Sequence, residues 1–205
     1  MPFDAATLVR EVTQLQQETV ARWHEVEPDN PYYGLLAVVC QQHEFNFLLW
    51  HEEDVARSPN VGDERIAQVK RAIDGHNQNR NDYIERVDEA LIERMATEGV
   101  MPRSDARVNT ETPGSAIDRL SIMSLRIFHL REQLQRDDVD QEHRQRVEER
   151  LARCGVQHVD LSQSLVELLE DLQSGHKMLK VYRQMKMYND PTLNPYLYQG
   201  ARKAG

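Results

Sequence analysis

The chain has 205 residues and a formal net charge of −9, which argues against a general nucleic-acid binder because such proteins need many Lys/Arg–phosphate contacts. Its low aromatic content, 6%, argues against a β fold, and no apolar run approaches the roughly 20 residues of a membrane span. The two cysteines, Cys40 and Cys154, both lie in apolar helical patterns, which is typical of buried thiols in a reducing cytoplasm.

Apolar residues recur at steps of three and four along the first half of the chain, which predicts three helices. The first covers about residues 4–25, and the second covers about residues 33–57. The second is apolar nearly all round, so we expect it to be central in a helical bundle. The third covers about residues 63–97, and its apolar stripe is interrupted between Ile73 and Ile84.

The second half of the chain predicts two further helices, after a loop at about residues 98–111. They cover about residues 113–136 and 141–174, and the short turn between them predicts an antiparallel hairpin. The last of them carries a coiled-coil seam with steps of four and three. Its members are Val147, Leu151, Cys154, His158, Leu161, Leu165, Leu168 and Leu172.

Gly175 interrupts the pattern before a last segment at residues 176–188, and an irregular tail follows at residues 189–205. We therefore expect an all-α protein, an up-and-down bundle of five to six helices with one long antiparallel hairpin. Residues 1–188 form its single domain.

The start of the fourth predicted helix has the most suggestive local chemistry. Thr112 is a good N-cap, Pro113 suits the first helical position, and Gly114 and Ser115 add little bulk. Such a start leaves backbone N–H groups open to an anion, and Arg119 adds positive charge nearby. We expect Thr112, Ser115 and Arg119 to bind an anionic ligand. An ordinary helix start without a ligand is the alternative.

Polar residues interrupt the buried stripe of the third helix at Asn77, Arg80 and Asn81. An arginine on a core-facing stripe must be paired or must face a wet cleft. Asp54, Asp118 or a bound anion could be its partner. We expect Asn77, Arg80, Asn81 and Asp118 to contribute to a ligand site, with a structural ion-pair network as the alternative.

His51 and Asp54 are three residues apart on the second helix and can touch. A histidine beside a carboxylate can act as a general base, so these two are the candidate catalytic pair. A buried histidine satisfied by a neighbouring acid is the alternative. A metal site at His51 with Glu44 or Asp54 is the least favoured hypothesis, and no cofactor is expected. Three further histidines look isolated on their helices and are expected to pack or to face solvent: His129, His158 and His176.

Long motifs in the chain together resemble the bacterial domain-of-unknown-function 4254 family, over about residues 10–198. The motifs are Leu49-Trp50-His51-Glu52-x-Asp54, Asn77-x-x-Arg80-Asn81-Asp82-x-Ile84-Glu85-x-Val87-Asp88, Asn109 to Ile122, and Lys186 to Pro191 with Asn194-Pro195. Val87 stands where the family pattern has Ile. The resemblance implies a single all-α domain of unassigned activity, in gene neighbourhoods associated with surface glycans or lipopolysaccharide.

Two classes of function follow from these observations. The first is an enzyme or binding protein for a phosphorylated or sugar-nucleotide-like anion, held by Arg80 and Arg119, with acid–base chemistry from His51 and Asp54. The second is a non-catalytic scaffold for a glycan-assembly enzyme, suggested by the long seam and by a Met/Tyr-rich end. That end contains Met178, Tyr182, Met185, Met187 and Tyr188. A homodimer through the last long helix is compatible with either class.

Overall fold

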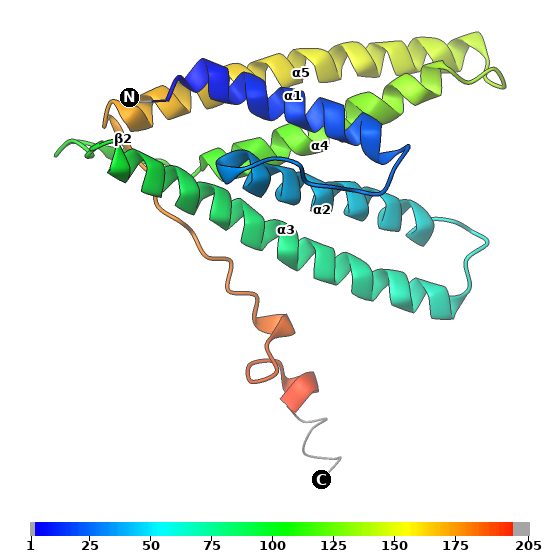
Figure 1. Ribbon diagram of the computed structural model, residues 1–205. Coiled ribbons are helices and arrows are strands. Elements are labelled where there is room, and N and C mark those ends of the chain that lie inside the picture. Colours follow the sequence, from blue (N-terminus) through cyan, green and yellow to red (C-terminus); the bar gives the residue numbers. More distant parts are fainter. Residues whose placement is uncertain (1–2, 199–205) are drawn as a thin grey trace.

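The computed structural model describes residues 3–198, and in that part of the chain the protein is a bundle of five long α-helices (Figure 1). The helices are α1 (Ala5–Trp23), α2 (Gly34–Ala56), α3 (Asp63–Thr97), α4 (Pro113–Leu134) and α5 (Gln141–Gln173). The smaller elements are β1 (Arg107–Val108), β2 (Lys177–Met178) and the 3-10 turn η1 (Met187–Asn189). The all-α prediction is confirmed, and the last residues of the predicted tail, 199–205, lie outside the described residues.

Three of the five long helices, α1, α4 and α5, begin at a short polar side chain that caps the first turn. Asp4 accepts a hydrogen bond from the Thr7 N–H at 2.7 Å, and Asp140 accepts one from the His143 N–H at 2.7 Å. These caps satisfy backbone donors that have no partner within the helix. Among the described residues, no helix has an apolar stretch long enough to cross a membrane.

Two helical hairpins, α2–α3 and α4–α5, form most of the bundle, and α1 packs against α2, α4 and α5 (Figure 1). α2 contacts α1, α3 and α4, which explains why its sequence is apolar nearly all round. The main core contains the fully buried Val12, Leu91, Leu120 and Leu169, from four different helices.

The predicted seam of α5 is buried only at its two ends. Val147, Leu165 and Leu172 are in the core, whereas the middle of the seam is half-buried. There Cys154 and Leu161 line surface grooves, and Leu161 also packs against the edge of the core. Cys154 is therefore not the buried thiol that its sequence pattern predicts.

The first residues of the segment after α5 pair with the loop that precedes α4. β1 and β2 form a two-stranded parallel ladder, and the Arg103 N–H donates to the Gly175 carbonyl at 3.0 Å. Gly175 has a φ of +72°, and a Cβ there would lie 2.7 Å from the Met101 carbonyl oxygen. Glycine at 175 is thus required for this close turn.

Candidate functional site

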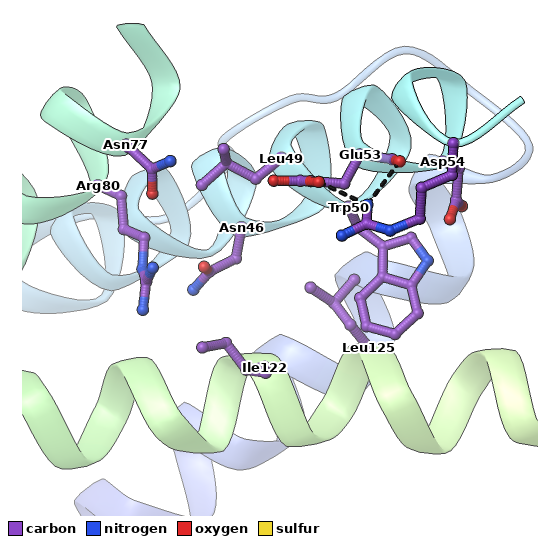
Figure 2. A pocket seen from close by; sticks show the side chains of 10 residues that line it. Asn46, Leu49, Trp50, Glu53, Asp54, Asn77, Arg80, Ile122 and Leu125 are labelled. Atoms are coloured by element: carbon purple, nitrogen blue, oxygen red, sulfur yellow. Dashed lines mark hydrogen bonds and ion pairs between the residues drawn. The ribbon is translucent and has the colours of Figure 1, made fainter. Parts of the chain in front are cut away.

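A cleft of about 380 Å³ lies between α2, α3 and α4; we call it the α2–α3–α4 cleft (Figure 2). Its polar lining side chains are Asn46, Glu53, Asp54, Arg57, Asn77 and Arg80. Figure 2 shows Asn77 and Arg80 entering from α3, opposite the apolar side chains Ile122 and Leu125 of α4. Of the residues singled out from the sequence, Asp54, Asn77 and Arg80 therefore meet in one cleft.

Arg80 is bound to Asp118, one of the three partners that the sequence left open. Its Nε–H donates to Asp118 Oδ1 at 2.7 Å, and its Nη2 donates to Oδ2 at 2.5 Å. Gln42 and Asn46 donate to the same Oδ1 atom at 2.6 and 2.9 Å. Asp118 is only 5% exposed, and its hydrogen bonds to Arg80 raise the pKa of the guanidinium. The charge of Arg80 is thus balanced within the protein.

The polar network continues below the cleft, where it joins α2 to α4. Asn46 also donates to Ser121 Oγ at 2.8 Å, and His43 Nδ1 lies 2.7 Å from the same oxygen. Burial lowers the pKa of His43 to about 3, so its ring is neutral at physiological pH. A neutral, fully buried imidazole with a hydroxyl partner has a structural role.

The start of α4 has the cap that the sequence predicts, but it is not open to an incoming anion. Thr112 Oγ1 accepts a hydrogen bond from the Ser115 N–H at 3.1 Å. The Gly114 N–H donates to Asp88 Oδ1 at 2.7 Å, so a carboxylate of α3 already occupies the position. A Cβ at Gly114 would lie 2.4 Å from the Ile84 carbonyl oxygen. The prediction of open backbone N–H groups is therefore wrong at Gly114, because α3 packs directly on this turn.

Arg119 and Asn81 lie outside the α2–α3–α4 cleft. Arg119 is exposed on α4, pairs with Glu111 at 3.2 Å, and lines a different groove between α4 and α5. Asn81 is half-buried on α3 and is not among the residues that line the cleft. The expected convergence of Arg80 with Arg119 around one anion is not what the structure shows.

His51 is grouped with two other histidines, His24 and His129; we call these three the histidine cluster. Their ring centroids are 5.1 Å apart for His24–His51, 5.1 Å for His24–His129 and 5.9 Å for His51–His129. Burial lowers the pKa of His51, and the two neighbouring histidines lower it further. Within the described residues no hydrogen bond joins His51 to Asp54, and only Asp54 lines the cleft. His129 is not isolated as its sequence context suggests.

A second groove, of about 340 Å³, lies between α2, α4 and α5; we call it the arginine groove. Arg126, Arg150 and Arg153 line it, with Trp50 and Leu130 among its apolar side chains. No carboxylate belongs to its described lining, and none of the three arginines has an ion pair or hydrogen bond with another described residue. Three cations therefore surround a mostly apolar hollow.

The sequence alone did not predict the arginine groove, because its three arginines come from two different helices. On α4, Arg126, His129 and Leu130 fall on one face, and on α5 Arg150 and Arg153 do the same. Each set alone looks like an ordinary charged helix surface. Only the register of the α4–α5 hairpin brings the two faces together.

Comparisons with known proteins identify a family and nothing about activity. The family model described as "Protein of unknown function (DUF4254)" matches residues 36–181, well over half of the chain. No curated protein matches, and no solved structure matches.

Proposed function

Because this chain belongs to the DUF4254 family, whose description assigns no function, we propose from its geometry that it binds an anionic small molecule in the arginine groove. The observation that carries this proposal is the convergence of Arg126, Arg150 and Arg153 around an apolar hollow without a carboxylate in the described lining. Guanidinium groups match the geometry of phosphate oxygens and can bind them through paired N–H groups.

The charge balance favours the arginine groove over the α2–α3–α4 cleft. Two arginines and two carboxylates line the cleft, so their formal charges cancel, whereas three arginines line the groove. In the cleft, Arg80 is bonded to Asp118 and Arg57 to Glu53, the latter at 2.5 Å. An anion in the cleft would have to compete with these carboxylates.

The ligand that fits this chemistry carries a phosphate and a less polar body, as a sugar phosphate or nucleotide sugar does. Trp50, Leu130 and Cys154 offer apolar surface to a ring, and the volume suits a small molecule. The resemblance to a family from glycan gene neighbourhoods supports a ligand of bacterial surface-glycan metabolism. Free Cys40 and Cys154 support a reducing cytoplasm as the compartment.

The test is isothermal titration calorimetry with pyrophosphate, a sugar phosphate, a nucleotide sugar and an uncharged sugar. Wild type is expected to bind the phosphorylated compounds and not the uncharged sugar. Replacing both Arg150 and Arg153 by Gln should weaken binding at least tenfold, since each charged hydrogen bond contributes about 1.5–3 kcal/mol.

The matched control replaces Arg71 and Arg131 by Gln, because both arginines are exposed and lie outside the groove. Their replacement lowers the net charge by the same two units as the test variant. The control should bind as wild type does. Wild type that binds no phosphorylated compound, or equal loss in both double variants, would overturn the proposal.

A second candidate function is a non-catalytic scaffold for a glycan-assembly enzyme. The observation that favours it is the segment after β2, which is tied to α3 by ion pairs of Arg183 with Glu85 and Glu89 and nevertheless exposes large apolar side chains. They include Tyr182, Met185, Met187, Leu193 and Tyr196. Such side chains mark protein contacts when they gather on one segment. Analytical ultracentrifugation should then show an assembly, either with a partner or with a second copy of the chain. The double substitution Tyr182→Ser and Met185→Ser should dissociate this assembly. A clean monomer under all conditions would count against the scaffold function.

A further inference from the structure

We infer that the histidine cluster, His24, His51 and His129, binds a transition-metal ion of the zinc class. One ring nitrogen from each histidine lies within 4.8 Å of the others. The three residues come from the end of α1, from α2 and from α4, so the ion would join three helices. This inference is independent of the anion-binding proposal.

The arrangement of the three rings resembles that around a tetrahedral ion. Zinc–nitrogen bonds of about 2.0–2.1 Å with tetrahedral angles put imidazole centroids about 5 Å apart. Two of the three observed centroid separations are 5.1 Å, and only His51–His129, at 5.9 Å, must close slightly. The rings are steeply inclined to one another, at 68°, 71° and 78°, so they are not a parallel stack.

Hydrogen bonds leave Nε2 of two histidines free to bind the ion. His24 Nδ1 lies 2.6 Å from the Val20 carbonyl oxygen, and His129 Nδ1 lies 2.6 Å from Glu132 Oε2. Because each partner is an acceptor, each Nδ1 carries the proton and each Nε2 carries the lone pair. This is the arrangement that metal-binding histidines adopt, with the second nitrogen donating to a carbonyl or carboxylate.

The same two Nε2 atoms are buried and have no hydrogen-bond partner among the described residues. A buried acceptor without a partner is unfavourable, and a bound cation would satisfy both atoms at once. This observation, together with the ring geometry, separates the cluster from an ordinary group of packed histidines.

Aromatic side chains hold the rings in place. Trp50 stacks on His129 with centroids 4.6 Å apart, and Phe128 stacks on His24 at 4.2 Å. Phe47 contacts His51 edge-on at 4.5 Å. A set of three imidazoles suits Zn²⁺, Ni²⁺, Cu²⁺ or Fe²⁺ and not Mg²⁺ or Ca²⁺, which prefer oxygen. Three protein ligands leave a fourth position for water or a ligand atom.

His129 belongs both to the histidine cluster and to the lining of the arginine groove. An ion at the cluster would therefore lie next to the groove. Metal binding by itself needs none of the groove arginines, so the two proposals can succeed or fail separately.

The experiment uses the full chain, stripped of metal with a chelator, and titrates it with Co²⁺ as the optical probe. The expected result is one Co²⁺ per chain with the intense absorption of tetrahedral Co²⁺, which Zn²⁺ then displaces. Zn²⁺ should also raise the melting temperature of the wild type. His24→Gln, His51→Gln and His129→Gln, tested singly, should each weaken binding at least tenfold.

His158→Gln is the matched control, because His158 is also half-buried on a helix and its Nε2 also lacks a partner in the described chain. It should bind the ion as wild type does, and so should the Arg150→Gln, Arg153→Gln double variant. Glu132→Gln tests the supporting hydrogen bond and should weaken binding about 10- to 100-fold. Absence of stoichiometric Co²⁺ and Zn²⁺ binding by wild type, or binding that survives in every folded cluster variant, would overturn the inference.

Discussion

Both oxygens of the Asp118 carboxylate accept hydrogen bonds from the guanidinium of Arg80, so a bidentate ion pair joins α4 to α3. Gln42 and Asn46 extend the contact to α2. The pair is thus a junction of three helices with little exposure to water. Its first role is to hold the bundle together.

Asp118→Ala should destabilise the protein by about 3–5 kcal/mol, because it leaves Arg80 without its partner in a poorly solvated position. Urea denaturation gives the free energy of unfolding. The control is Glu111→Ala, which removes an exposed ion pair with Arg119 and should cost about 0–1 kcal/mol. Equal costs for the two variants would contradict a structural role for Asp118.

Gly114→Ala should destabilise the protein by about 3 kcal/mol, since the added Cβ would meet the Ile84 carbonyl oxygen at 2.4 Å and force α4 away from α3. Gly75→Ala is the control in an exposed turn of α3, where a Cβ meets nothing within 4 Å. That substitution should stabilise the protein by about 0.5–1 kcal/mol. The melting temperatures of the two variants should therefore move in opposite directions from wild type.

Asp88 predicts a pH dependence of stability. Burial raises the pKa of its carboxyl to about 6, although the Thr112 hydroxyl and the Gly114 N–H act against this shift. A group whose pKa is higher in the folded state stabilises the fold below its unfolded pKa of about 4, and this contribution is lost as the pH rises to about 6.

Asp88→Asn stays neutral and should keep the acceptor for Gly114. Its stability relative to wild type should therefore increase by about 2–3 kcal/mol between pH 4 and pH 7. Denaturation of both proteins across this range measures the difference. A difference that does not change with pH would mean that folding does not raise the pKa of Asp88.

The helices could be predicted from the sequence because a 3.6-residue apolar period reports directly which face is buried. The same pattern showed that Arg80 interrupts a buried face and must have a partner, and Asp118 was among the three candidates. Thr112 and Pro113 likewise marked the start of α4. These are local properties, or properties of one helix face.

The remaining contacts could not be predicted because they depend on the register between helices. Asp88 reaches Gly114 only because α3 packs against the first turn of α4. His24 meets His129 across more than a hundred residues, and Arg126 meets Arg150 across a hairpin. Periodicity within one helix contains no information on how far a neighbouring helix is shifted along it.

The most direct test of the anion-binding proposal is NMR chemical-shift mapping during titration with pyrophosphate, observing the Trp50 indole N–H and the arginine Nε–H groups. We expect saturable shifts for Arg126, Arg150 and Arg153, and also for Trp50, which lines both the groove and the cleft, while Arg80 stays unchanged in its pair with Asp118. Shifts of Arg80 and Asn77 without shifts of Arg150 and Arg153 would place the ligand in the α2–α3–α4 cleft instead. That result, or no saturable shift at all, would contradict the proposed function.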